Sequence, residues 1–223
     1  MRWWPPLPCP GCGRRLAGDD GACTACWAEI DRGAADRGAV DRVAADRGAV
    51  VDATGAWLLA LGPYRGTLGR IVRAAKYRPS TALLRALGSR LGARAAAHWP
   101  GFERATWVVP VPPDGARQRR RGVDHTAVLA GSVAAAVGRP ASARAMLVRR
   151  RPTRPQSRTP WTLREANLHG AIVPRSGGSD CVGARIMLID DVSTSGATLR
   201  ACRAALLEAG AKEVRAAVVA RAR

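Results

Sequence analysis

Long hydrophobic runs are missing from this sequence of 223 residues. No segment approaches the roughly 20 consecutive apolar residues of a membrane-spanning helix, and the first ten residues, MRWWPPLPCP, lack the apolar core of a signal peptide. The G-x-x-x-x-G-K-[ST] pattern of P-loop proteins is also absent. We therefore expect a cytoplasmic protein that has no membrane span and no P-loop.

Lysine and aromatic residues are scarce as well, although the chain is strongly basic. Lys76 and Lys212 are the only lysines among 36 basic residues, against 17 acidic ones, and the formal charge is +19. Such a charge attracts polyanions, including nucleic acids, but the arginines are spread along the whole chain and a genomic bias toward Arg codons is an alternative origin. Aromatic residues, which would stack on single-stranded DNA, make up only 4%. The tryptophans near the proposed sites are Trp3, Trp4, Trp27 and Trp161.

Four of the six cysteines form two C-x-x-C pairs near the N-terminus. They are Cys9, Cys12, Cys23 and Cys26. Four thiolates at this spacing can surround one tetrahedral Zn²⁺, so we predict a structural zinc site. Two disulfides, or a redox C-x-x-C that needs no second pair, are the alternatives. Cys181 and Cys202 are expected to be packing or surface residues.

A five-residue unit repeats between residues 31 and 50: DRGAA, DRGAV, DRVAA, DRGAV. A period of five matches neither helix nor strand, which predicts a low-complexity linker, with a helical spacer as the alternative. The sequence is 47% hydrophobic, enough for one packed core with a small appendage. We accordingly predict a finger at residues 1–30, a linker at 31–53 and a main domain at 54–223.

Apolar strands alternate with helical segments after the linker. Strands are predicted near residues 57–62, 107–112 and 186–189. A helix is predicted after the Gly-Pro turn, with Ile71, Val72 and Ala75 on one face, and further helices are predicted near 81–98, 125–138 and 198–210. This alternation predicts an α/β fold with a mostly parallel sheet and helices on both faces. Ligands of such sheets bind beyond the carboxyl ends of the strands.

Two adjacent carboxylates, Asp190 and Asp191, follow the strand at 186–189, and small residues at 193–198 lead into the last helix. The free amides and the dipole of a helix N-terminus favour an anionic group there. Carboxylates beside that group can accept hydrogen bonds from sugar hydroxyls or help hold Mg²⁺. The alternative is an ordinary turn in which Asp, Ser and Thr only cap the helix.

The string LIDDVSTSGATL resembles the signature by which type I phosphoribosyltransferases bind phosphoribosyl pyrophosphate (PRPP). With the four-cysteine finger and the segments YRGTLGRIVRAAKYR, VVPVP, RQRRRGVDHTAVLA and RPTRPQSRTPWTLREANLHGAIV, the chain resembles the ComF family of competence-associated relatives of these enzymes. The resemblance implies a type I phosphoribosyltransferase-like domain, a small N-terminal zinc-ribbon-like finger, structural Zn²⁺, and Mg²⁺ that binds together with PRPP.

The resemblance also implies roles for individual residues. The PRPP 5-phosphate would lie against Ser193, Thr194, Ser195, Gly196, Ala197 and Thr198. Asp190 and Asp191 would bind the ribose hydroxyls and act as the catalytic carboxylates. Pyrophosphate would meet a basic loop and a closing lid at residues 149–167. The residues implied there are Arg117, Arg119, Arg120, Arg121, Arg164 and Asn167, with Thr153 and Gln156 matching a further family element.

The chain departs from the family pattern in two places. Residues 121–125 are R-G-V-D-H where the family commonly has R-G-F-N-Q, and Ser195 replaces the more common Thr. We predict a PRPP-binding, phosphoribosyltransferase-like protein that transfers the phosphoribosyl group to a nitrogen nucleophile and releases pyrophosphate. The alternative is a non-catalytic protein of competence DNA uptake that binds single-stranded DNA or a helicase.

Overall fold

The computed structural model describes residues 7–16, 21–35, 57–77, 80–101, 106–113, 123–138, 143–150 and 170–222. At its centre is a parallel sheet in the strand order β1-β6-β5-β2. Its strands are β1 (Leu58–Pro63), β2 (Thr106–Pro110), β5 (Arg185–Ser193) and β6 (Glu213–Arg221). The last of these strands was not predicted from the sequence. A separate antiparallel pair joins β3 (Leu147–Arg149) to β4 (Ile172–Pro174), which is followed by the 3-10 helix η4 (Arg175–Cys181).

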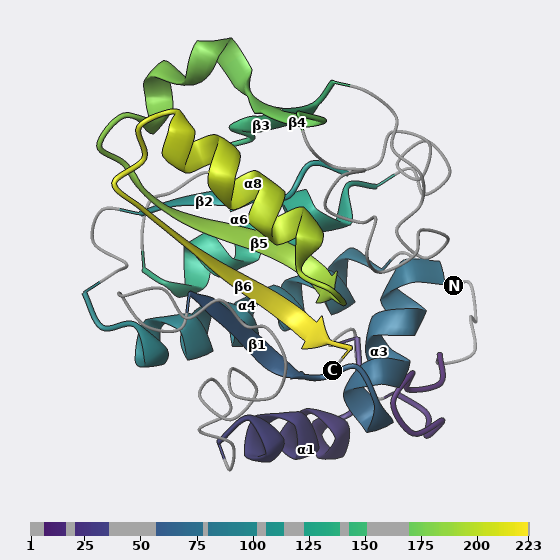
Figure 1. Cartoon of the computed structure of the whole chain (residues 1–223). Coiled ribbons are helices and arrows are strands. Elements are labelled where there is room, and N and C mark those ends of the chain that lie inside the picture. Colours follow the sequence, from purple (N-terminus) through teal and green to yellow (C-terminus); the bar gives the residue numbers. More distant parts are fainter. Residues whose placement is uncertain are drawn as a thin grey trace, which may run out of the picture.

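Helices cover both faces of this sheet, as predicted (Figure 1). On one face lie α3 (Gly66–Tyr77), α4 (Thr81–His98) and α6 (His125–Ala136). On the other face lies α8 (Ala197–Glu208). Side chains of a strand point alternately to its two faces, and in β5 Met187 and Ile189 join the core under α3, α4 and α6, whereas Ile186 and Leu188 join the core under α8. Strands buried on both faces explain the nearly continuous apolar runs of the sequence.

Local signals fix where two of the helices begin. Ser80 Oγ accepts a hydrogen bond from the amide of Leu83 at the start of α4. The carboxylate of Asp124 accepts one from the amide of Ala127 at the start of α6, at 3.0 Å. Both are side-chain caps that satisfy otherwise unpaired helix amides. Asp124, one of the departures from the family pattern, therefore has a structural role in this chain.

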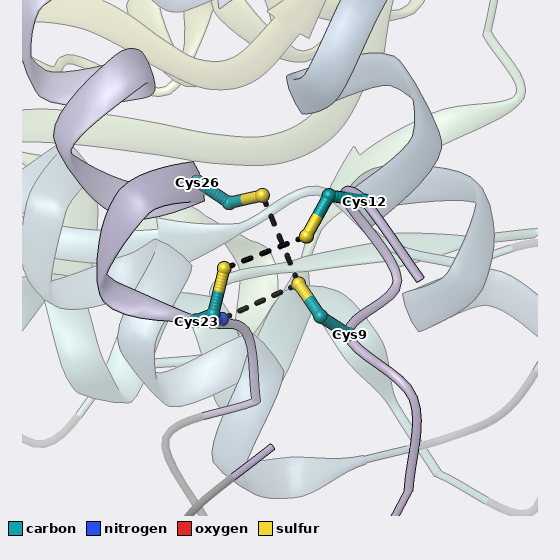
Figure 2. A group of neighbouring side chains, drawn as sticks. All are labelled: Cys9, Cys12, Cys23 and Cys26. Carbon is teal, nitrogen blue, oxygen red and sulfur yellow. Dashed lines mark hydrogen bonds between the residues drawn. The ribbon is translucent and has the colours of Figure 1, made fainter. Parts of the chain in front are cut away.

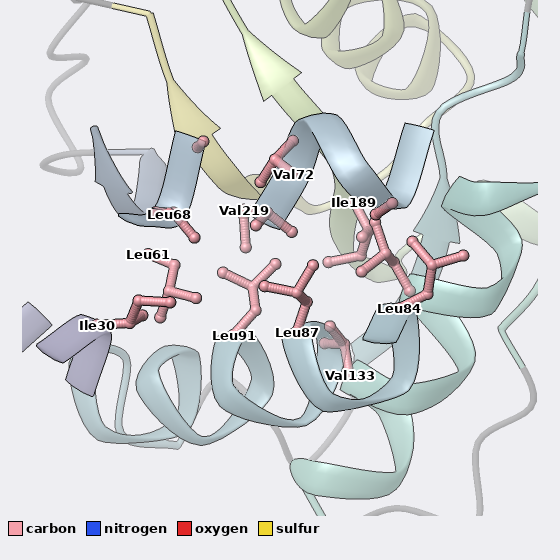
Figure 3. Close-up of a cluster of buried hydrophobic side chains, with 14 of the residues drawn as sticks. Ile30, Leu61, Leu68, Val72, Leu84, Leu87, Leu91, Val133, Ile189 and Val219 are labelled. Atoms are coloured by element: carbon pink, nitrogen blue, oxygen red, sulfur yellow. The ribbon is translucent and has the colours of Figure 1, made fainter. Parts of the chain in front are cut away.

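The N-terminal finger and α1 (Thr24–Ala35) lie against the α3 side of the main sheet. The finger brings the four cysteines of the two C-x-x-C pairs together (Figure 2). Ile30 of α1 belongs to the same buried cluster as Leu61 of β1 and Leu68 of α3 (Figure 3). The finger thus shares its core with the main domain. The proposed division at residues 30 and 53 stays a prediction, and residues 36–56 lie outside the described part of the chain.

Candidate functional site at the carboxyl edge of the sheet

The acidic pair lies within β5 rather than after it. We expected the strand to end at Ile189, but β5 continues to Ser193 because it keeps pairing with β6 as far as Arg221. On its other side, β2 pairs with β5 only as far as Ile189. Asp190 and Asp191 therefore occupy a stretch of β5 that extends beyond β2 at the ligand-binding edge of a parallel sheet.

The two carboxylates face opposite sides of the sheet, as neighbouring residues of a strand do. Asp191 Oδ2 lies 3.0 Å from Lys76 Nζ of α3, on one face. Asp190 lies on the face that α8 covers, where burial and then the Asp190 charge raise the pKa of the Cys202 thiol. The backbone amide of Asp191 donates a hydrogen bond to Asp190 Oδ1 at 2.8 Å. This separation reduces the direct repulsion that two adjacent acids would otherwise have.

The environment of Asp190 favours its neutral form. Burial and then the charge of Asp191 raise its pKa, the Asp191 amide, Lys76 and Arg149 oppose them, and the net result is a pKa of about 7. Arg149, the last residue of β3, is the nearest described part of the predicted lid, and its guanidinium donates to the carbonyl of Pro112 at 3.5 Å. A carboxyl group that titrates near neutral pH can donate or accept a hydrogen bond, which suits a hydroxyl-bearing ligand.

A short turn at residues 194–196 joins β5 to α8. Gly196 has a φ of +74°, a conformation that L-residues other than glycine adopt at a cost. Arg200 donates from Nη1 to the carbonyl of Ser195 at 2.9 Å, and the Ala197 amide donates to Ser195 Oγ at 3.3 Å. Ser193 is only 4% exposed, and its Oγ has no hydrogen-bond partner among the described residues. The turn therefore combines a helix N-terminus with a buried hydroxyl that can still donate.

The structure describes only part of the site that was predicted from the sequence. It brings Asp190 and Asp191 close to the predicted phosphate-binding residues. Of these, Ser193 ends β5, residues 194–196 form the turn, and Ala197 and Thr198 begin α8. The other predicted residues lie outside the described residues: Arg117, Arg119, Arg120, Arg121, Thr153, Gln156, Arg164 and Asn167.

Sequence reasoning missed Lys76, which the fold brings to the acidic pair from about 115 positions earlier in the chain. The signal that could have found it is compositional, because Lys76 is one of only two lysines among 36 basic residues. Its ammonium also lies 5.9 Å from the centre of the Tyr64 ring, within the range of a cation–π contact.

The four-cysteine cluster has the dimensions of a metal site. The Sγ atoms of Cys9 and Cys26 are 3.7 Å apart, those of Cys12 and Cys23 are 3.6 Å apart, and all four lie within 4.8 Å of one another (Figure 2). Tetrahedral zinc with bonds of about 2.3 Å requires sulfur atoms about 3.8 Å apart, whereas a disulfide requires about 2 Å. The cysteines are free thiols, so the predicted clustering is confirmed and the geometry suits a metal ion.

Amide groups around the cluster favour thiolate sulfur. The amide of Cys23 donates to Cys9 Sγ at 3.3 Å. Burial alone would raise the pKa of Cys9, but the amides of Cys23, Gly11 and Cys12 outweigh it and lower that pKa to about 6. The pKa of Cys26 is raised by burial and by the neighbouring thiols. The cluster therefore provides one ready thiolate, and a cation would be needed to hold four together.

Hydrogen bonds connect the finger to the first turns of α3. Arg70 donates from Nε to the carbonyl of Gly11, between the first two cysteines, at 2.6 Å, and from Nη2 to Thr67 Oγ1 at 2.9 Å. Thr67 in turn donates to Glu29 of α1 at 2.9 Å. Because Gly11 has no side chain, Cys26 and Thr67 can approach it closely. The finger is thus attached to the helix whose last turn carries Lys76.

The described tryptophan of the finger does not offer a stacking surface. Trp27 is buried, and the guanidinium of Arg90 lies 4.0 Å from the centre of its ring. Trp3, Trp4 and Trp161 lie outside the described residues. Cys181 and Cys202 are buried packing residues, one of the two outcomes expected for them. Within the described ranges, no helix combines the length and the apolar character needed to cross a membrane.

Comparison with known proteins links the C-terminal part of the chain to one family. Residues 127–223 match the phosphoribosyl transferase domain family. One solved structure, described as the allosteric regulatory enzyme of purine biosynthesis, is similar at 25% sequence identity with a TM-score of 0.40; the match covers 61% of this chain and 26% of that one. No curated protein sequence matches the chain significantly. The family match includes β5, the acidic pair and the turn before α8.

Proposed function

We propose that this protein binds PRPP at the carboxyl edge of the sheet and acts as a phosphoribosyltransferase. The observation that carries the proposal is the buried Ser193 hydroxyl, which has no hydrogen-bond partner in the part of the chain that the structure describes and lies next to a glycine turn and the N-terminus of α8. A phosphate placed there would accept hydrogen bonds from that hydroxyl and from helix amides. The match of residues 127–223 to the phosphoribosyl transferase domain supports the same function.

Different residues of the site would bind different parts of such a ligand. The turn at 193–198 would hold the 5-phosphate, while Asp190 and Asp191 would address the ribose hydroxyls from the strand end. Mg²⁺ would arrive with the pyrophosphate and neutralise its charge. In the reaction, the bond between C1 of the ribose and the pyrophosphate oxygen breaks, and its electron pair leaves with pyrophosphate. The acceptor nitrogen forms the new bond to C1 and loses a proton. Asp191, and Asp190 in its ionised form, would stabilise the positive charge that develops on the ribose.

The first test uses calorimetry with Mg-PRPP on Asp190→Asn with Asp191→Asn. Loss of two charge-assisted hydrogen bonds, at about 1.5 to 3 kcal/mol each, should weaken binding by two to four orders of magnitude. The matched control is Asp180→Asn, which removes a carboxylate that lies on the surface and pairs with Arg144. The control should bind like the wild type.

Wild-type affinity in the double variant would show that the pair only caps the turn, and would remove the main support for the proposal. Pyrophosphate release, assayed across nucleobases and amines, then tests transfer itself. If the protein binds Mg-PRPP but releases pyrophosphate with none of these acceptors, it is a PRPP-binding protein that does not transfer the phosphoribosyl group to these acceptor classes.

We further propose that Cys9, Cys12, Cys23 and Cys26 hold one structural Zn²⁺. The sulfur spacing and the amide donation to Cys9 support it. Zinc analysis of the purified protein should find about one equivalent, and Cys9→Ser with Cys12→Ser should remove it because half of the ligands are lost. Cys181→Ser with Cys202→Ser is the control for the loss of two thiols and should keep the metal. Metal retained in the first variant would contradict the assignment.

A further inference from the structure

An ion pair bridges α3 and the end of β5 beside the candidate site. Lys76 Nζ lies 3.0 Å from Asp191 Oδ2, and the two side chains are only 20% and 19% exposed. A pair that is shielded from solvent in this way is less screened by salt than the exposed ion pairs of the surface. It joins an element outside the matched phosphoribosyl transferase domain to one inside it.

Packing fixes the position from which Lys76 reaches Asp191. Ile71, Val72 and Ala75 are buried on the sheet-facing side of α3, which sets the rotation of the helix. The Tyr64 ring, 5.9 Å from the ammonium, supports it from the side. The Tyr64 amide donates to the carbonyl of Arg221 at 2.7 Å, so this ring is attached to the end of β6. The ammonium therefore lies beside the end of β5, which it contacts through Asp191, and near the end of β6, to which Tyr64 is bonded.

The choice of lysine at this position is notable in a chain that uses arginine for 34 of its 36 basic residues. The other lysine, Lys212, is exposed. An ammonium is a compact point charge, whereas a guanidinium is a broad planar fork with five donors. The compact group fits between one aromatic ring and a single carboxylate oxygen.

We propose that Lys76 is a positioning residue of the phosphoribosyl site and that it acts through Asp191. By engaging Oδ2, it fixes the carboxylate and the end of β5, which follows two residues later at Ser193 and leads into the turn. It also keeps the negative charge of Asp191 compensated next to Asp190. This inference rests on the proposed function, since the positioned carboxylate is the one assigned to the ribose hydroxyls.

The test compares Lys76→Met with Arg73→Met. Arg73 lies on the same helix, its guanidinium is 5.7 Å from the same Tyr64 ring, and it is exposed, so this control loses the same charge and a similar ring contact without touching Asp191. By calorimetry with Mg-PRPP, Lys76→Met should weaken binding about tenfold or more, and Arg73→Met less than about twofold. Lys76→Arg, which keeps the charge in a broader group, should bind Mg-PRPP within about threefold of the wild-type affinity.

A second measurement needs no ligand. In urea unfolding, the combined effect of Lys76→Met and Asp191→Asn should be smaller than the sum of the single effects, because each removes the same pair. Additive effects on the unfolding free energy would overturn the proposal. So would any of three binding results: wild-type affinity for Mg-PRPP in Lys76→Met, an equal loss of affinity in Arg73→Met, or no recovery of affinity in Lys76→Arg. A wild-type protein that does not bind Mg-PRPP would instead overturn the proposed function, and this inference with it.

Discussion

Replacement of Gly196 by alanine tests whether the turn before α8 is a phosphate cradle. The φ of +74° at this position costs an L-residue about 1 to 2 kcal/mol, which sets the expected loss in the free energy of unfolding. The new methyl group would lie 3.0 Å from Arg200 Nη1 and 3.9 Å from Ser193 Oγ. The Arg200 guanidinium is at the end of a long side chain and can shift, at the cost of its hydrogen bond to the Ser195 carbonyl, so the steric addition to the unfolding free energy is at most about 1 kcal/mol.

Gly183→Ala separates backbone strain from ligand binding. Gly183 has a φ of +69°, a methyl group there would meet nothing within 4 Å, and it precedes the start of β5, at the opposite end of that strand from the turn. Urea unfolding should therefore show similar losses in both variants. Calorimetry with Mg-PRPP should show at least about a tenfold loss of affinity for Gly196→Ala alone, because the methyl group occupies the space where a phosphate would contact the backbone.

Two results would contradict a phosphate-binding role for the turn. If Gly196→Ala loses about 1 to 2 kcal/mol of stability but binds Mg-PRPP like the wild type, the glycine serves only the backbone conformation of the turn. If both variants lose affinity equally, global destabilisation rather than the cradle explains the loss.

Three further predictions concern helix packing, pH dependence and the finger. Gly88→Ala should lower the unfolding free energy by about 1 to 3 kcal/mol, because its methyl group would lie 2.8 Å from the carbonyl oxygen of Leu129 in α6. Gly131→Ala, whose methyl group would meet nothing within 4 Å, should raise it by up to about 1 kcal/mol. Urea unfolding in which both variants change the unfolding free energy in the same direction would contradict this. Burial raises the pKa of Asp190 from 3.8 to about 7, so the folded protein holds a proton between these values that the unfolded chain has lost. This contribution to stability is complete below pH 3.8 and is lost as the pH rises through 7. Asp190→Asn should therefore gain stability relative to the wild type between pH 5 and pH 8, by at most about 4 kcal/mol. A difference in unfolding free energy between variant and wild type that stays constant across this pH range would refute it. Arg70→Met, which removes the bond to the finger carbonyl, should speed the loss of zinc to a chelator, and an unchanged rate would show that the finger holds its metal without α3.

Local patterns in the sequence determined most of the elements and one of the sites. The helix at 81–98 has the predicted bounds, because an N-cap serine and an apolar helical repeat act over a few residues. The clustering of the four cysteines follows from two short knuckles, and the turn before α8 from small residues between a strand and a helix. These features depend on neighbours in the chain, so a single sequence is enough to predict them.

Only the tertiary structure decided where the two carboxylates of the acidic pair lie. The sequence placed both carboxylates after the strand, but pairing with β6 extends β5 to Ser193, and the alternation of an extended strand then sends Asp190 toward α8 and Asp191 toward α3. Lys76 could not be assigned to the site from sequence, since its contact depends on the rotation of α3 against the sheet. Strand pairing and helix packing join residues that are more than 100 positions apart, and no local pattern records which ones will meet.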